Sequence, residues 1–94
     1  MALLDVAQIE TQGADLLVVF VPPETNFFND SQRARLRDVL IRALVAHGLS
    51  GELVAAWQHE GEFSFMAHPR LHNFLASAGY EAIYAHRSAQ IECA

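Results

Sequence analysis

The sequence predicts an α+β domain of the ferredoxin-like class, an antiparallel sheet with two helices on one of its faces. Two observations lead to this prediction. Runs of apolar, β-branched residues alternate with two segments that have helical periodicity, in the order (β)-β-α-β-β-α-β. A glycine-containing turn joins the two middle strands, which links two β-α-β units as in ferredoxin-like folds. We expect the 94 residues to form one domain, 1–94, since a chain of this length holds a single core.

The first elements are two strands. Residues 16–21 are apolar at every position, which is typical of a central strand covered on both faces. Pro22 and Pro23 end this strand because neither has an N–H to donate to a neighbouring strand. Residues 4–11 predict an optional strand before it, with a turn over 12–15; a short helix is the alternative for this first segment.

A long helix follows, from Asn29 or Asp30 to His47. Asn and Asp are favoured N-cap residues, and Gly48 stands where a Schellman ending requires a left-handed residue. At 100° per residue, one face of this helix is apolar and must pack on the sheet. That face consists of Leu36, Val39, Leu40, Ala43, Leu44 and His47.

The second half of the chain predicts a hairpin, a helix and a strand. Residues 53–58 and 63–67 predict two strands joined by a tight turn, in which Gly61 supplies a positive φ. Pro69 suits the first position of a second helix, which Gly79 ends. Residues 81–87 predict the last full strand, and residues 88–93 a short return. The second helix has an apolar stripe of Leu71, Phe74, Leu75 and Ala78.

The composition favours a protein that associates with itself or with a partner. Apolar residues make up 52% of the chain and charged residues 18%, against about 25% in an ordinary domain, so apolar side chains are expected outside the core. A sheet with helices on one face would leave its central strand uncovered on the other, and a second copy is the simplest cover. The first hypothesis is therefore a small non-catalytic binding or regulatory module that forms a homodimer, or binds a protein partner, through this open face or the outer stripe of the long helix. Its interface candidates are Phe20, Phe63 and Phe65 on the sheet and Ile41 and Val45 on the helix.

A loop and several histidines are the candidates for a ligand pocket. Residues 22–29 form a long connection beyond the carboxyl end of the central strand, where ligands often bind. The candidates are Glu24, Phe27 and Phe28 in this loop, with His59, His68 and His72. The alternative hypothesis is a small dimeric enzyme with a His/Glu pocket on the sheet face, in which one of these histidines or His86 acts as acid or base beside Glu24, Glu60 or Glu62. We assign no catalytic residue.

A metal site has one weak indication. His68 and His72 have the i,i+4 spacing of a metal-binding pair, but the neighbouring sequence supplies no third ligand. We therefore predict neither a metal nor another cofactor.

The strand order and the phenylalanines resemble the RNA recognition motif. Val19-Phe20-Val21 would stand for the first short motif of that family, and residues 61–66, Gly-Glu-Phe-Ser-Phe-Met, for the second. The resemblance covers these two strands only, and it implies RNA binding through exposed Phe20, Phe63 and Phe65. Glu62 departs from the family, which favours a basic residue nearby. The chain also has no lysine and a net charge of −5, so nucleic acid is not the expected partner.

The sequence predicts neither a membrane segment nor an oxidising compartment. The longest apolar run, residues 16–23, is too short to span a bilayer, and the first ten residues lack the basic region of a signal peptide. Cys93 is the only cysteine, so an internal disulfide is excluded. We expect a cytoplasmic protein without membrane contact.

Overall fold

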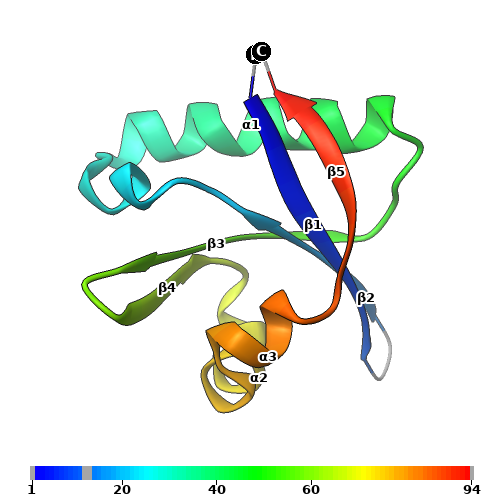
Figure 1. Cartoon of the computed structure of the whole chain (residues 1–94). Helices are drawn as coiled ribbons and strands as arrows, with labels where there is room; N and C mark the ends of the chain where they lie inside the picture. The colour runs from blue at the N-terminus through cyan, green and yellow to red at the C-terminus, as the bar shows by residue number, and fades with distance from the viewer. Residues whose placement is uncertain (1, 12–13, 94) are drawn as a thin grey trace.

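A mixed sheet is the centre of the computed structural model, which describes residues 2–11 and 14–93 (Figure 1). The strands of the described residues are β1 (Ala2–Thr11), β2 (Ala14–Phe20), β3 (Glu52–His59), β4 (Glu62–Met66) and β5 (Arg87–Cys93). Their order across the sheet is β4-β3-β2-β1-β5. β2 and β3 pair in parallel and the other neighbours are antiparallel. A parallel pair needs a crossover connection, and the helix α1 (Asp30–Ala46) provides it.

Local sequence signals determine both ends of α1, and both ends are confirmed. Asn29 forms a capping box, in which its side chain accepts from the Gln32 N–H (2.8 Å) and the Gln32 side chain accepts from the Asn29 N–H (2.9 Å). At the other end, the N–H of Leu49 donates to the Leu44 carbonyl and the N–H of Gly48 to the Val45 carbonyl, each at 3.0 Å. These two bonds are the Schellman pattern.

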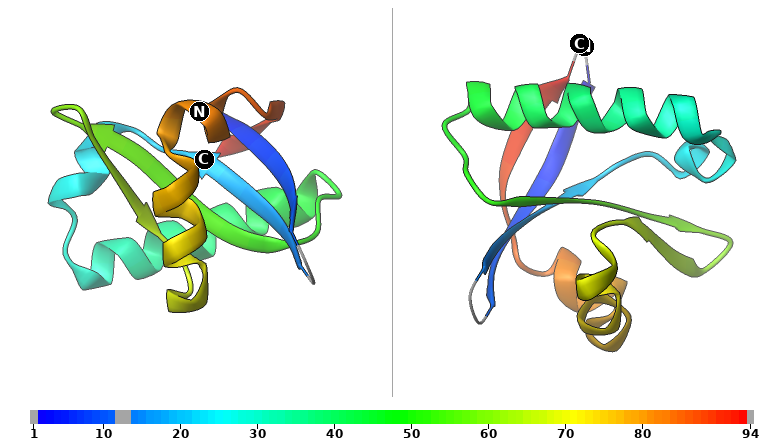
Figure 2. Two further views of the ribbon diagram at one scale, coloured as in Figure 1. Left: turned by 90° about the horizontal axis from the view of Figure 1, so that it is seen from below. Right: turned by 180° about the vertical axis from the view of Figure 1, so that it is seen from behind.

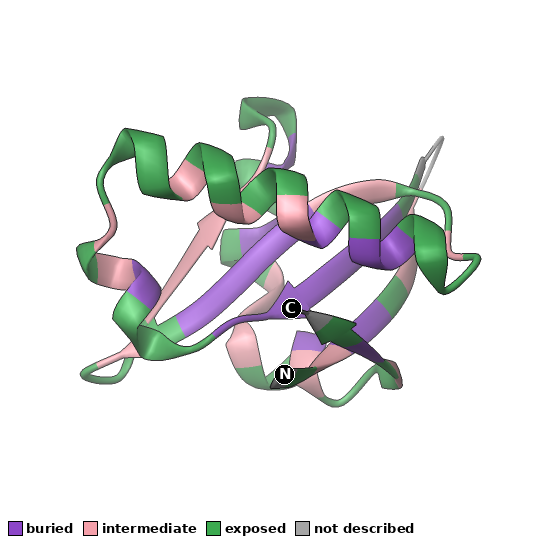
Figure 3. Ribbon diagram, turned by 90° about the horizontal axis from the view of Figure 1, so that it is seen from above, coloured by how far each residue is buried: buried purple, intermediate pink, exposed green. Residues whose placement is uncertain are grey.

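The helical segments cover opposite faces of the sheet (Figure 2). α1 packs on one face, where Figure 3 shows the buried central strands beneath the helix. A short 3-10 turn η2 (Pro69–Leu71), α2 (His72–Ala78) and α3 (Tyr80–Tyr84) pack on the other face. The core on the α1 side contains Val6, Leu17, Val19, Val21, Leu40, Ala43, Leu44, Ala55, Trp57 and Ile91. The core on the other side contains Ala7, Leu16, Val18, Phe20, Val54, Ala56, Leu71, Leu75 and Ile83.

The α+β class is confirmed, but the ferredoxin-like arrangement is not reproduced in detail. The sheet is mixed instead of antiparallel, because β2 pairs directly with β3. β1 is a full strand between β2 and β5, so the last strand pairs with β1 at the edge. The prediction of both helices on one face is wrong, since Leu71, Leu75 and Ile83 are buried against the second face. β2 is covered on both faces, as its apolar pattern predicts, and α2 and α3 supply the second cover.

The prediction of a strand over residues 81–87 is also wrong. These residues belong mostly to α3 and the turn after it, and the final strand is β5, where a short return is predicted. Tyr80, Ile83 and Tyr84 have the i, i+3, i+4 spacing of a helix face. The rings of Tyr80 and Tyr84 lie edge-on to Phe20, with centroid distances of 5.6 and 4.9 Å, and Ile83 is 1% exposed. Packing of this face against the sheet stabilises the short helix.

The hairpin and the first strand are confirmed. His59 pairs with Glu62, and the φ angles of Glu60 (52°) and Gly61 (80°) are both positive, as in a type I′ turn. The first predicted strand is β1, while residues 12–13 of the turn after it lie outside the described residues. Ala2 pairs with Cys93, so the outer ends of β1 and β5 lie side by side (Figure 1).

Candidate functional site

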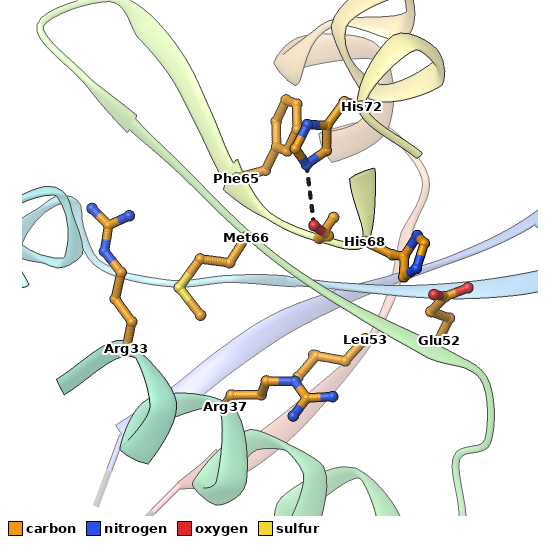
Figure 4. A pocket seen from close by; sticks show the side chains of 9 residues that line it. Arg33, Arg37, Glu52, Leu53, Phe65, Met66, His68 and His72 are labelled. Carbon is orange, nitrogen blue, oxygen red and sulfur yellow. Dashed lines mark hydrogen bonds between the residues drawn. The ribbon is translucent and has the colours of Figure 1, made fainter. Parts of the chain in front are cut away.

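A groove lies between the first half of α1 and the end of β4 (Figure 4). It has a volume of about 530 Å³, within the range of about 300–1,000 Å³ typical of small-ligand sites. In the close-up, Leu53 and Met66 lie between the two arginines of α1 and the polar side chains of Glu52, His68 and His72. The residues that line the groove are Arg33, Arg37, Glu52, Leu53, Phe65, Met66, Ala67, His68 and His72.

Two arginines on successive turns of α1 give the groove its charge. Arg33 and Arg37 are four residues apart and therefore lie on the same side of the helix. The Arg33 guanidinium lies 5.4 Å from the Trp57 ring centre and donates to the Asn26 carbonyl at 3.4 Å. Its Nε is buried and has no hydrogen-bond partner in the part of the chain that the structure describes. The exposed Arg37 has no ion pair or hydrogen bond to a side chain among residues 2–11 and 14–93.

The opposite rim contains one glutamate and two histidines. Glu52 forms an ion pair with Arg70, which neutralises its charge. His68 caps η2, because its Nδ1 accepts from the Arg70 N–H at 3.2 Å. His72 Nε2 lies 3.1 Å from the Ala67 carbonyl oxygen, and its ring lies edge-on to Phe65 at 5.2 Å. These contacts use Nδ1 of His68 and Nε2 of His72, so the other ring nitrogen of each histidine has no hydrogen bond among the described residues.

The floor of the groove is apolar. Leu53 and Met66 are half-buried and pack on the α1-side core, and Phe65 and Ala67 pack on the other core. A groove with an apolar floor and guanidinium groups at its rim suits a ligand that joins an apolar part to a carboxylate or phosphate.

Of the predicted pocket residues, the structure places His68 and His72 in this groove. Phe27 and His59 form a separate contact at the β3–β4 hairpin, with ring centroids 5.0 Å apart and Phe27 73% exposed. Glu24 lies in the 3-10 turn η1 (Pro23–Phe27), and Phe28 follows it. Neither residue lines the groove. The long loop is held to the sheet by Asn26, whose side-chain oxygen accepts from Trp57 Nε1 at 3.3 Å.

The predicted interface residues on the sheet lie under α2 and α3. Phe20 is buried, and the Phe63 ring lies 5.2 Å from that of Phe65 and 5.7 Å from that of Tyr80. The open sheet face expected from the sequence is therefore absent from the described structure. The three exposed phenylalanines that RNA stacking requires are not displayed together. In this aromatic cluster, burial raises the pKa of Tyr80 above its usual value, with smaller contributions from Tyr84 and Asp5.

The outer stripe of α1 is exposed as expected. Ile41 is 36% exposed and Val45 69%. Association of two copies through this stripe stays a prediction.

The histidines do not gather into one buried cleft. His68 and His72 share the groove, but His59 lies at the hairpin and His86 between α3 and β5. Within residues 2–11 and 14–93, no group of three or more His, Cys, Asp or Glu side chains is placed to hold a metal ion.

Sequence reasoning missed Arg33 and Arg37. A signal existed, since two of only six basic residues stand four apart at the start of the long helix. Arg35 and Arg42 lie on the same helix, however, and helical spacing alone does not show which arginine faces the end of β4. That placement depends on how the helix packs over the sheet.

Comparison of the chain with known proteins gives no match to a family model, a curated protein or a solved structure. Among the described residues, no helix combines the length and the apolar character needed to cross a membrane.

Proposed function

We propose that the protein is a small non-catalytic binding module whose site is the groove between α1 and β4, and that its ligand carries a negative charge next to an apolar part. The observation that carries this proposal is the position of Arg33 and Arg37 beside the apolar floor of Leu53 and Met66. The groove takes the place of the open sheet face as the binding surface.

The charge around the groove has the opposite sign to that of the whole chain. Among the residues that line the groove, Arg33 and Arg37 contribute +2 and Glu52 contributes −1, which gives +1 with neutral histidines. The complete chain has a net charge of −5. A positive site on a negative molecule attracts an anionic ligand to that site and repels it elsewhere.

The guanidinium groups suit the recognition of a carboxylate or phosphate. Arginine binds these groups through two parallel N–H donors, and a hydrogen bond to a charged group contributes about 1.5–3 kcal/mol. The unpartnered Nε of Arg33 would gain an acceptor if its side chain turned towards a bound anion. Loss of one arginine contact is therefore expected to weaken binding about 10- to 100-fold.

The contacts of the histidines favour binding over the alternative of an enzyme. Both His68 and His72 are exposed, and each uses one ring nitrogen in a contact with the backbone. Glu52, the carboxylate of the groove, is already engaged in an ion pair with Arg70. A general acid or base works best in a site that excludes water, and both histidines lie at an exposed rim.

Small aromatic anions test the proposal. We expect phenylacetate or phenyl phosphate to shift the amide NMR signals of residues that line the groove, and neutral phenylacetamide to leave them unchanged. Trp57 is the only tryptophan and contacts Arg33, so its fluorescence gives a second signal. Arg37→Gln should weaken anion binding about tenfold or more.

Arg35→Gln is the matched control, because Arg35 is exposed on the same helix and does not line the groove. Equal effects of Arg35→Gln and Arg37→Gln, or equal binding of phenylacetate and phenylacetamide, would contradict the proposal.

A further inference from the structure

We infer that the ligand of this groove is an extended acidic peptide segment of another protein, which adds to the free edge of β4 and directs acidic side chains to Arg33 and Arg37. This inference rests on the proposed function and specifies the class of ligand.

The free edge of β4 borders the groove. β4 is one of the two edge strands, and among the described residues all five of its residues pair with β3 on one side only. In an antiparallel pair, alternate residues direct their N–H and C=O groups away from the partner strand. These groups form a template on which an extended peptide can pair. Phe65 and Met66, at the end of this strand, also line the groove.

The β4 edge lacks the features that usually protect an edge strand. Proteins block such edges with proline, lysine, bulges or charges within the strand. β4 reads Glu-Phe-Ser-Phe-Met, with its single charge next to the hairpin turn, and its register with β3 is continuous. The other edge strand, β5, carries Arg87 and Glu92, and its register with β1 shifts between Val6 and Ala7. The contrast favours β4 as the edge that accepts another strand.

The two sides of an added strand would meet different surroundings. Met66 packs towards the α1-side core, whereas Phe63 and Phe65 pack towards α2 and α3. Successive residues of an added strand alternate in the same way. Every second side chain of the peptide therefore faces the side of Arg33 and Arg37, and the residues between face the side of the phenylalanines. Acidic and apolar residues in alternation match this surface.

Backbone methylation of the peptide tests strand addition directly. The probe is a short peptide in which Asp and Val alternate, and its binding is measured by NMR titration of the full chain. In one derivative the Asp amide nitrogens are methylated, and in another the Val amide nitrogens. Only one of the two sets can donate to β4, so we expect one derivative to lose affinity about tenfold or more and the other to keep it. Similar affinity of both derivatives and the unmethylated peptide would overturn strand addition.

Charge is tested with matched variants on both molecules. A peptide with Lys in place of Asp should not bind, and Arg37→Glu should weaken the acidic peptide by about tenfold or more while Arg35→Glu has little effect. Equal binding of the Lys and Asp peptides would overturn the inference.

The remaining outcomes separate this inference from the proposed function. If phenylacetate binds in the groove and the acidic peptide does not, the peptide ligand is wrong and the anion site stands. If neither binds, both are wrong. A second copy of the chain is the other possible occupant of the β4 edge, and sedimentation of the free protein tests for it. A dimer that the acidic peptide dissociates would show that the edge binds a second copy, and this result would also overturn the inference.

Discussion

Gly51 lies where the chain leaves the α1 crossover and enters β3. Its φ is 149°, and a Cβ at this position would lie 2.8 Å from the carbonyl oxygen of Asp15 and 3.1 Å from the side chain of Leu17. Leu16, between these two residues, pairs with Glu52 in the parallel register. The start of β3 therefore reaches β2 closely only because residue 51 has no side chain.

Gly51→Ala is expected to lower the free energy of unfolding by about 2–4 kcal/mol, since backbone strain and steric overlap each contribute about 1–3 kcal/mol. Gly61→Ala is the control, because its φ is also positive but a Cβ there would meet no atom of the described residues within 4 Å. It should cost about 1 kcal/mol. Urea denaturation measures both values, and equal losses would show that the close approach to β2 has no energetic effect.

The residues of the groove differ in how far the sequence reveals them. His68 and His72 are recognisable because Pro69 marks a helix start and places them one turn apart. Arg33 and Arg37 share their helix with Arg35 and Arg42. Only the packing of α1 over the sheet places the first pair, and not the second, in the groove. The two arginines that give the groove its positive charge are therefore placed by tertiary contacts, which the local sequence does not reveal.

At the scale of single elements, α1 shows how much a local sequence determines. Asn29 and Gln32 begin the helix through their reciprocal hydrogen bonds, and Gly48 and Leu49 end it. These signals act over a few residues, so the bounds of the helix follow from the sequence.

Asn29→Ala removes the side-chain acceptor of the capping box and should lower the free energy of unfolding by about 1 kcal/mol. Ser31→Ala, at an exposed position in the same turn, should change it by less than about 0.5 kcal/mol. Thermal unfolding followed by circular dichroism compares the two variants. A smaller effect for Asn29→Ala than for Ser31→Ala would contradict the role of the cap.

α3 shows where local signals are not sufficient. Tyr, Ile and a second Tyr within five residues fit a strand by composition and a helix by spacing. The contacts of Tyr80 and Tyr84 with Phe20, some 60 residues earlier in the chain, decide for the helix. The position of β1 between β2 and β5 also depends on long-range contacts. For this reason the sequence predicts strands where β1 to β4 form, but it predicts neither the full last strand β5 nor the order of the strands in the sheet.

At the scale of the whole molecule, one sheet separates two apolar cores. β2 contributes to both, with Leu17 and Val19 on the α1 side and Val18 on the other. Neither core can lose its cover without exposing a face of the shared strands. The two layers are therefore expected to unfold together.

Leu40→Ala and Leu75→Ala test this coupling, because each removes a fully buried side chain from a different core. Each should lower the free energy of unfolding by about 2–5 kcal/mol. The double variant should show the sum within about 0.5 kcal/mol, since the two side chains lie in separate cores. Calorimetry should give one transition for each single variant. Two separate transitions would mean that the layers unfold independently.

The pairing of Ala2 with Cys93 has a consequence for protein engineering. Facing residues of an antiparallel pair lie about 5 Å apart, so the two ends of this unit are separated by little more than one residue of extended chain. A unit closed in this way can be spliced into a surface loop of a host protein without forcing the two sides of the loop apart. The β4 edge and the groove between α1 and β4 lie on the opposite side of the sheet from the paired ends of β1 and β5. Both would therefore remain accessible in such a fusion.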